Sequence, residues 1–453
     1  MFKKIEIWIL YLVVLLGIPV TIGFGYLVRQ ELAGHKKLGR VSKTALFLAQ
    51  MPIKINKILK NIDDLQVKDR FPSLDGFNGT PNLNESYLLL SRYEGNLKEG
   101  IVELVDLTNF KVLHTWNPDI DEFNKSVQNI DEFKYLNRDA NNSRYLLRHP
   151  NLLKDGGLVF QYTSPLIKID ACSNLIFQNQ HDIFHHSIET DIDGNIWVPS
   201  HLYPQSLPIY KVGTNIINEK GYFDDAIVKL SADGEILFEK SVSQIFVDNG
   251  LEYLLFAVGN FDFNKDPIHL NDIQPVESDG EFWKKGDVFL SLRHQSMVLL
   301  YRPSTNRILW KGTGPFFHQH DVNILNNHSI SIFNNNSKNL VDGDVVDGNN
   351  EVLIYDFKTN KYSSYLSDSL IKNDVRTVTS GRSKILQNGD LFIEESNYSR
   401  NLYLNSDGSL RWTYMNRAEN GKTYAVKWSR ILSNYDDIKL VNNFLKSRDK
   451  CND

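Results

Sequence analysis

Cysteine is scarce in this chain. Among its 453 residues there are only two, Cys172 and Cys451. Two thiols cannot form the framework of several disulfides that stabilises many small secreted domains, and no Cys-x-x-Cys pair suggests a cysteine-based metal site. Whether the two cysteines pair with each other stays open at this level.

Sequence elements that bind nucleotides or nucleic acids are also missing. The chain has no P-loop, no Gly-x-Ser-x-Gly and no Gly-x-Gly-x-x-Gly element, so nucleotide-dependent transfer is not indicated. The formal net charge is −5, and no long basic run is interleaved with aromatic residues. We therefore expect no cofactor and no nucleic-acid partner.

Charged residues are nearly absent from the beginning of the chain. The run from Ile5 to Val28 contains one charge, Glu6, and exceeds the roughly 20 apolar residues that cross a bilayer. It lacks a small-residue cleavage pattern, so residues 1–30 are predicted to be a transmembrane anchor, with a cleaved signal peptide as the alternative. More basic residues follow the run than precede it, and by the positive-inside rule this would leave the domain in the cytoplasm. These residues are Lys3, Lys4, Arg29, Lys36, Lys37, Arg40 and Lys43.

The remainder of the chain changes character twice. Residues 31–75 are predicted to be a juxtamembrane helical connector, because apolar residues recur at helical spacing between Lys43 and Asp64. From residue 76 to 453 the pattern becomes short alternating strands separated by Asp-Gly, Asn-Gly and Asn/Ser turns, which is typical of an all-β fold.

Two patterns alternate along this β region. The first is a hairpin whose second strand ends in an aromatic residue, and its six copies begin at Val102, Leu166, Ile227, Leu299, Leu353 and Leu402. The second is a polar residue, a hydrophobic stretch, a turn and a strand, with copies from Arg148, His186, Asn271, His320 and Gly381 and a degenerate copy before Val102. Two hairpins form a four-stranded sheet, so six repeats predict a six-bladed β-propeller. Two stacked β domains are the alternative.

In a propeller the innermost strands line an axial channel, and their first residues meet at one end of it. Alignment by turns places the starts of the second pattern in phase, with His149 and Arg382 one step later. Further polar residues lie close by in sequence: His185, His269, Arg293 and His318. Imidazole and guanidinium groups without a matching cluster of carboxylates favour an anionic ligand such as sulfate, phosphate or carboxylate. A neutral imidazole is also a competent nucleophile toward such a group.

A metal site is the competing interpretation of these histidines. His185, His186, His269 and His320 are ligand types suited to zinc or copper. Arg293 would oppose a cation, and a catalytic metal site commonly includes a carboxylate or cysteine. The preferred interpretation therefore contains no metal. A carboxylate within reach of three histidines would favour the metal.

Several segments resemble the arylsulfotransferases (aryl sulfate sulfotransferases). They are FHHSIETDIDGNIWV from Phe184, HLND from His269, SLRHQS from Ser291, HQHDVNIL from His318 with IFNNN from Ile332, and GRSKILQNGDLFIEESNYSR from Gly381. The resemblance covers roughly Arg148 to Arg430 and matches a shorter, divergent branch of the family.

The resemblance implies a six-bladed propeller and a ping-pong reaction without a nucleotide donor. In that reaction His320 attacks the sulfur of a phenolic sulfate and forms a sulfohistidine, and a second phenol then accepts the group. His186, His269 and Arg293 are implied as further catalytic residues, and His185, Asn271, Arg382 and His318 as substrate-binding residues. The family's usual place is the bacterial periplasm, which implies a periplasmic domain anchored in the inner membrane.

Two other functions remain open at this level: a non-catalytic propeller that binds anions in its channel, and a metal-dependent hydrolase. Three acidic residues are given structural roles. Asp321 should point away from His320 on its strand. Of Glu394 and Glu395, only one can face the channel, and a rim ion pair with Arg382 or Arg400 is the simpler interpretation.

Overall fold

The chain divides into two compact units in its computed structural model, which describes residues 6–32, 38–59, 65–128, 136, 140–181, 183–207, 222–257, 265–340 and 343–448. One unit comprises residues 1–64 with 213–218, and the other comprises residues 65–212 with 219–453. Among the residues singled out above, Lys3, Lys4, Lys36, Lys37 and Cys451 lie outside the described ranges.

The first unit contains two helices, α1 (Ile7–Leu32) and α2 (Gly39–Leu59). At 1.5 Å per residue, the 26 residues of α1 extend about 39 Å, which exceeds the roughly 30 Å of a bilayer's hydrocarbon core. Within the described ranges, α1 alone is long and apolar enough to span a membrane. The two helices are linked by a hydrogen bond of 2.7 Å that the Ser42 hydroxyl donates to Glu31.

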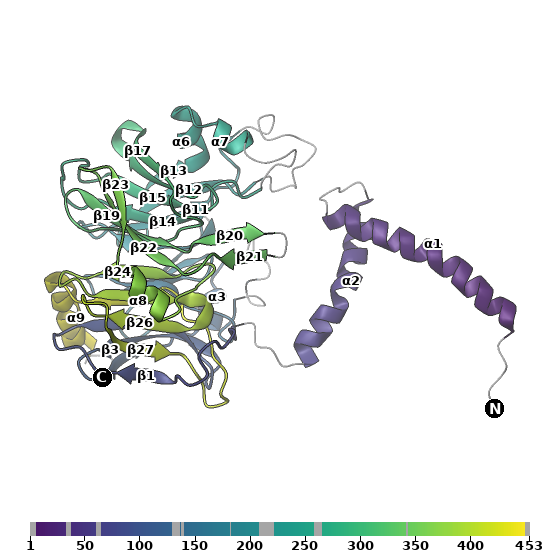
Figure 1. Cartoon of the computed structure of the whole chain (residues 1–453), viewed down its shortest axis with the longest axis horizontal. Coiled ribbons are helices and arrows are strands. Elements are labelled where there is room, and N and C mark those ends of the chain that lie inside the picture. Colours follow the sequence, from purple (N-terminus) through teal and green to yellow (C-terminus); the bar gives the residue numbers. More distant parts are fainter. Residues whose placement is uncertain are drawn as a thin grey trace. The chain divides into compact units, whose positions relative to one another are not determined.

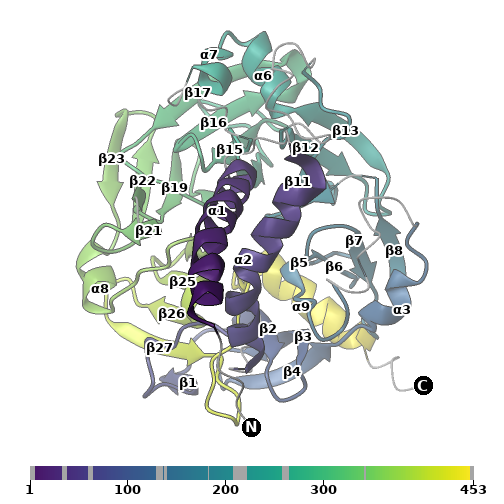
Figure 2. The same cartoon turned by 90° about the vertical axis from the view of Figure 1, so that its right-hand side faces the viewer.

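The second unit is a six-bladed β-propeller, as predicted. Each blade is a four-stranded antiparallel sheet, and the blades follow one another in a ring, as Figure 2 shows. Blade 1 contains β28 (Arg430–Leu432), β2 (Tyr87–Glu94), β3 (Glu99–Asp106) and β4 (Lys111–Trp116); blade 2 contains β5 (Arg148–Leu152), β6 (Leu158–Gln161), β7 (Leu166–Ile169) and β8 (Leu175–Asn179); blade 3 contains β10 (Glu189–Thr190), β11 (Ile196–His201), β12 (Asp225–Leu230) and β13 (Ile236–Ser241), with β9 (Ile183–Phe184) beside β11.

The other three blades are built in the same way. Blade 4 contains β14 (Leu270–Pro275), β15 (Val288–Leu292), β16 (Met297–Arg302) and β17 (Arg307–Thr313); blade 5 contains β18 (Val322–Ile324), β19 (Ser329–Asn334), β22 (Glu351–Asp356) and β23 (Lys361–Ser364); blade 6 contains β24 (Arg382–Ile385), β25 (Leu391–Glu395), β26 (Arg400–Leu404) and β27 (Leu410–Met415), with β1 (Gly76–Gly79) at its outer edge.

Blade 1 closes the ring by combining strands from both ends of the propeller. Its innermost strand, β28, pairs with β2, placing Ile431 opposite Leu88 and Leu432 opposite Tyr87. This explains the degenerate first copy of the second pattern, because the segment before Val102 supplies only β2. The innermost strand of that blade comes from the other end of the β region.

The core lies between neighbouring blades because each strand sends alternate side chains to its two faces. On β2, Leu88 and Leu90 pack against blade 6, whereas Tyr87 and Leu89 pack against blade 2. The second strand of a blade is covered on both faces, and on β6 all four residues, Leu158 to Gln161, are buried. The blades are thereby held in fixed angular positions around the channel.

The second unit also contains elements outside the six blades. The second unit includes the residues from Leu65 onward, and Val67 donates a backbone hydrogen bond to Thr423 at 3.0 Å. Figure 1 shows the hairpin β20–β21 and helix α9 on opposite sides of the propeller. The added elements are α3 (Ile120–Asn124), α6 (Val242–Asp248), α7 (Tyr253–Phe256), α8 (Ser367–Lys372), α9 (Tyr435–Arg448), β20 (Ser337–Leu340), β21 (Gly343–Val346) and two short 3₁₀ helices, Pro303–Thr305 and Ser396–Tyr398.

Candidate functional site

Each blade has a non-glycine residue with a left-handed backbone at or just before its innermost strand. Such residues are uncommon, and strained conformations of this kind cluster at functional sites. Their φ angles are 52° at His149, 58° at His186, 55° at His269, 51° at His318, 61° at Ser380 and 65° at Trp428. Six matching positions, four of them histidines, therefore surround one mouth of the channel.

His269 and His318 share the left-handed backbone of His186, and Asn271 and His320 each lie two residues after one of them. The next residues of these segments, Ser187, Asp272 and Asp321, each accept a backbone N–H from the innermost strand of the following blade. The pairing is irregular near two of the positions, because the register shifts after Leu270 in blade 4 and after Arg148 in blade 2.

The imidazole rings form an almost continuous belt with one indole. Centroid separations are 4.5 Å for Trp428–His149, 6.5 Å for His149–His186, 4.8 Å for His186–His269, 4.4 Å for His269–His294 and 6.3 Å for His294–His318. The structure thus brings the predicted residues His186, His269 and His318 together at one mouth. His185 lies behind His186, with their Nδ1 atoms 2.7 Å apart.

His320 is buried one step further into the channel. Its Nδ1–H donates to the amide oxygen of Asn335 at 2.6 Å, and its Nε2 accepts the backbone N–H of Ser380 at 3.0 Å. Both contacts require the neutral tautomer with the proton on Nδ1. Burial, followed by the nearby Arg293 guanidinium, holds the pKa of His320 well below its usual value. Nε2 therefore carries a lone pair at neutral pH.

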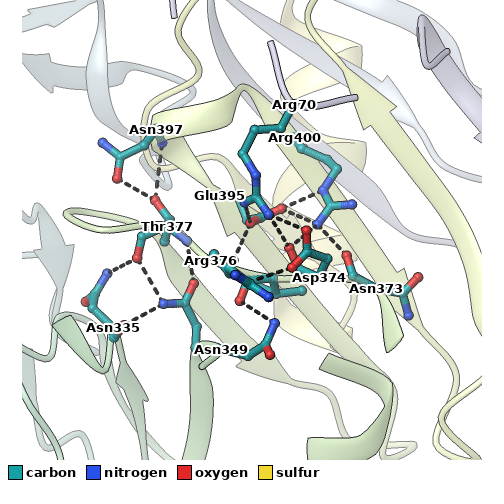
Figure 3. A network of polar contacts seen from close by, with 12 residues as sticks. Arg70, Asn335, Asn349, Asn373, Asp374, Arg376, Thr377, Glu395, Asn397 and Arg400 are labelled. Atoms are coloured by element: carbon teal, nitrogen blue, oxygen red, sulfur yellow. Dashed lines mark hydrogen bonds and ion pairs between the residues drawn. The ribbon is translucent and has the colours of Figure 1, made fainter. Parts of the chain in front are cut away.

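Asn335 is itself held in place by a polar network, part of which is drawn in Figure 3. Its amide donates to the backbone oxygens of Thr377, at 3.2 Å, and Ser380, at 2.8 Å. The Thr377 hydroxyl in turn donates to Asn397 at 2.7 Å. The orientation of Asn335, and with it the tautomer of His320, is therefore fixed by strand ends of blades 5 and 6.

The same network contains the predicted ion pair of Glu395. This fully buried carboxylate pairs with Arg400 and lies 3.6 Å from Arg70, which also reaches Asp374 at 2.5 Å (Figure 3). Glu394 also has a structural role, because it accepts backbone N–H groups of Trp428 and Ser429 at 2.6 Å. Neither glutamate is placed as an acid for substrate.

Two cationic side chains, Arg293 and Lys427, accompany the belt. Arg293 is buried, and its guanidinium lies 2.7 Å from His294 Nε2 and 3.4 Å from Asp344. Lys427 donates to the Ser380 hydroxyl at 3.1 Å, and burial, followed by the charge of Arg148, lowers its pKa to about 8. These charges give the mouth a positive field that suits an anion.

His269 forms a dyad with an acidic residue that sequence analysis did not single out. Its Nδ1–H donates to Asp266 Oδ2 at 2.6 Å, so Nε2 is the nitrogen available to a ligand. A carboxylate that holds one ring nitrogen stabilises the imidazolium formed when the other takes up a proton. The dyad is therefore suited to general acid–base chemistry.

Two predicted binding residues lie deeper than expected. Asn271 is fully buried, and its amide donates to the backbone oxygen of Gln319 at 3.0 Å, linking blades 4 and 5. Arg382 lies 3.5 Å from Asp321 and 5.1 Å from the centre of the Trp428 ring. It also lines a cavity of about 710 Å³, whose described lining contains no histidine. That cavity is therefore separate from the belt.

The channel also contains carboxylates, contrary to the expectation that none would match the cationic groups. Glu189 pairs with Arg430 at 2.8 Å, and Asp272 accepts the backbone N–H of Val322 at 2.8 Å. Asp321 accepts the backbone N–H of Ser383 at 3.0 Å, in keeping with its predicted structural role. These acidic groups join neighbouring blades below the belt, and the mouth itself keeps its excess of imidazole and cationic groups.

Several site residues were missed: His294 and Asn335 lie within quoted motifs but were not singled out, and the others lie outside those motifs. The segment VKWSRIL contains Lys427 and Trp428, and interpreting it as the sixth innermost strand would have predicted that these two residues lie at the site. The missed residues are His201, Asp225, Asp266, His294, Asn335, Ser380, Lys427 and Trp428.

Comparison with known families covers the part of the chain that contains most of these residues. The family model described as Arylsulfotransferase (ASST) matches residues 149–417, which is more than half of the chain. The chain belongs to the arylsulfotransferase family. The match begins at His149 and includes the residues of the belt up to His318, together with His320, Asn335 and Ser380. Aryl sulfotransferase activity is thus the general activity to which the family points. No curated protein matches the chain.

Solved structures show similarity only at the level of the propeller. A protein of unknown function from Bacteroides caccae is 11% identical, with a TM-score of 0.43, covering 73% of this chain and 94% of that one. TolB from Acinetobacter baumannii is 9% identical, with a TM-score of 0.39 and coverages of 87% and 73%. The WD40 β-propeller domain of Doa1 is 10% identical, with a TM-score of 0.39 and coverages of 82% and 98%. These similarities carry no functional inference.

Proposed function

We propose that this arylsulfotransferase moves a sulfuryl group from a phenolic sulfate ester to a phenol through a sulfohistidine at His320. The observation that carries the proposal is the state of His320. Burial and the nearby Arg293 guanidinium favour its neutral form, its Nδ1–H is held by Asn335, and its Nε2 carries the lone pair that accepts the backbone N–H of Ser380. A fixed neutral imidazole in a positive field is a suitable nucleophile for an anionic sulfate ester.

In the first half-reaction, Nε2 of His320 attacks sulfur. A bond from nitrogen to sulfur forms, the bond from sulfur to the phenolic oxygen breaks, and the phenolate leaves with the electron pair. The His269 imidazolium, stabilised by Asp266, gives its Nε2 proton to that phenolate. Positioned acid catalysis of this kind contributes roughly 10²–10⁴-fold. Arg293 faces the sulfuryl oxygens as negative charge shifts onto them.

The N–H of Ser380 has a second use in this step. It donates to Nε2 before the reaction, and this hydrogen bond must break when Nε2 bonds to sulfur. A donor 3.0 Å from the attacking nitrogen is then within reach of a sulfuryl oxygen. Ser380 would thereby act as an oxyanion donor that becomes available only as the new bond forms.

In the second half-reaction a phenol acceptor takes the place of the first product. Neutral His269 removes the phenolic proton, and the phenolate oxygen attacks sulfur. The bond between sulfur and Nε2 breaks, and its electron pair returns to His320. The cycle ends with neutral His320 and protonated His269, so no external oxidant, reductant or nucleotide is required.

Location is part of the proposal. We place the propeller on the periplasmic side of the bacterial inner membrane, with α1 as its anchor. In support, Cys172 is disulfide-bonded, and disulfides persist in oxidising compartments such as the periplasm. The basic residues that follow α1 argue for the other side, and the direct test is described in the Discussion.

Covalent labelling tests the chemistry. The full chain in detergent is mixed with p-nitrophenyl sulfate, and the intact mass is measured before a phenol is added. Wild-type protein should gain one sulfuryl group and lose it to the acceptor. His320→Ala should remain unlabelled, whereas His328→Ala, altered in the turn between β18 and β19, should label normally.

Other results would exclude sulfuryl transfer. Labelling of His320→Ala, or a wild-type protein that stays unlabelled with a panel of sulfate esters, would contradict the mechanism. Sulfate binding without any labelling would instead support the non-catalytic anion-binding propeller.

A further inference from the structure

A second cluster of chemistry-bearing side chains lies in blade 3, behind the belt. His185 follows β9, His201 ends β11 and Asp225 begins β12 directly opposite His201. One ligand-type atom from each residue lies within 4.8 Å of the others. His185 and Asp225 are buried, with exposures of 8% and 0%, whereas His201 is partly open to solvent.

The atoms that converge here lie close together, and two of them have no hydrogen bond of good geometry. His185 Nε2 and His201 Nε2 lie 3.2 and 3.4 Å from the same oxygen, Asp225 Oδ1. Despite these short distances, both His185 Nε2 and Asp225 Oδ1 are buried without a hydrogen-bond partner. Burial of such polar groups is costly unless something satisfies them.

A tetrahedral metal ion accounts for these distances. With metal–nitrogen and metal–oxygen bonds of about 2.0–2.2 Å, two ligand atoms of a tetrahedral site lie about 3.4 Å apart. The geometry points to a divalent metal site formed by Nε2 of His185, Nε2 of His201 and Oδ1 of Asp225. Two imidazoles and one carboxylate suit Zn²⁺, with Co²⁺ as its spectroscopic substitute.

The surroundings hold two of these ligands in the required orientation. The other oxygen of Asp225 accepts the backbone N–H of His269 at 2.9 Å, which leaves Oδ1 to face the two imidazoles. Nδ1 of His185 lies 2.7 Å from Nδ1 of His186. Metal-bound histidines usually donate their second ring N–H to such a partner, so His185 would donate to His186.

This second contact ties the metal to the belt. If Nε2 of His185 binds the metal, its proton is on Nδ1 and is donated to Nδ1 of His186. His186 must then carry its own proton on Nε2 and becomes a hydrogen-bond donor. The ion would thus fix the tautomer of a residue at the mouth while staying behind it, with a fourth coordination position that no described side chain supplies.

A neighbouring cluster provides a contrast. Asp266, His269 and His294 also bring a carboxylate and two imidazoles together. Here, however, His269 Nδ1 donates to Asp266 at 2.6 Å, and His294 bonds the backbone oxygen of Asp266 at 2.6 Å and the Arg293 guanidinium at 2.7 Å. Ring nitrogens already engaged, together with an adjacent arginine, make this cluster unsuited to a cation.

Metal analysis of the full chain in detergent tests the site, using Zn²⁺ alone and no sulfate ester. After dialysis against Zn²⁺ and removal of loosely bound ions, wild-type protein should retain one Zn²⁺ per chain. His201→Ala and Asp225→Asn should weaken binding by more than about 100-fold. His201→Cys should keep the metal, because a thiolate replaces the lost imidazole. Asp266→Asn is the matched control and should bind normally.

Substitution with Co²⁺ separates a ligand role from a folding role. Wild-type protein should show the strong visible bands of tetrahedral Co²⁺, and His201→Cys should add a thiolate charge-transfer band. Wild-type protein without bound metal, or equal metal content in wild type and a folded His201→Ala, would overturn the proposal. So would loss of metal in Asp266→Asn with retention in Asp225→Asn. Since no sulfate ester is present, failure here is distinct from failure of sulfuryl transfer.

Discussion

His320 shows how one amide side chain decides the chemistry of an imidazole. Asn335 accepts a hydrogen bond from the Nδ1–H, so the lone pair is on Nε2, where it accepts the backbone N–H of Ser380. The amide group of Asn335 is itself held by the backbone oxygens of Thr377 and Ser380. The imidazole of His320 must be neutral to act as a nucleophile at the pH of the reaction, at which the sulfate ester is an anion. Burial and the charge of Arg293 favour the neutral form, because both lower the pKa of His320.

The buried charge of Lys427 lowers the stability of the folded protein. Its pKa is lowered from 10.5 to about 8 by burial and by Arg148, so the folded protein binds its proton more weakly than the unfolded chain does. Between these values the unfolded state carries more protons, and stability gains with rising pH. Replacement by an uncharged side chain should therefore stabilise the protein at neutral pH.

We expect Lys427→Met to raise the free energy of unfolding at pH 7 by on the order of 1–3 kcal/mol. The gain should shrink as pH rises above about 8 and vanish near 10.5. Urea unfolding across this range measures it, with Lys311→Met, an exposed position on β17, as the control. The same variant should require more aryl sulfate for half-maximal labelling. A lower free energy of unfolding for Lys427→Met at pH 7 would show that the buried charge of Lys427 does not destabilise the folded state.

At the scale of elements, the hairpin repeats predicted the blades because each strand must bury alternate side chains. The prediction lacked the innermost strand of blade 1. That strand, β28, pairs with β2 from a distant part of the chain and belongs to no local hairpin. The left-handed positions were also invisible. A residue such as Trp428, with a φ of 65°, follows no residue-type rule and depends on surrounding packing. Register shifts in blades 2 and 4 were likewise invisible, because a bulge leaves no residue-type signal in the turns.

The closure of blade 1 can be tested through Ile431. This residue is buried on β28 and packs with Leu88 and Phe392 between blades 1 and 6. Ile431→Ala should lower the free energy of unfolding by about 2–5 kcal/mol, the usual cost of truncating a buried aliphatic side chain. Ile176→Ala, at a residue with 50% exposure on β8, should change it by less than about 0.5 kcal/mol. Similar small losses for both variants would mean that β28 contributes little to ring closure.

For the whole molecule, the two kinds of evidence on location conflict. The basic residues around α1 favour a cytoplasmic domain by the positive-inside rule, whereas the disulfide at Cys172 favours an oxidising compartment. A structural disulfide needs an oxidising compartment to persist, whereas charge bias is a preference that a long translocated domain can override. The periplasmic placement therefore stays a proposal, and reporter fusions test it.

Reporter fusions in bacterial cells decide between the two sides. A reporter phosphatase that needs disulfides to fold, joined after the last residue, should be active, and a reporter that works only in the cytoplasm should be inactive. Deleting residues 6–32 should make the first reporter inactive and the second active, because α1 is the segment proposed to anchor the chain in the membrane. The opposite pattern in the full chain would place the propeller in the cytoplasm and would leave the disulfide at Cys172 without a compartment to maintain it.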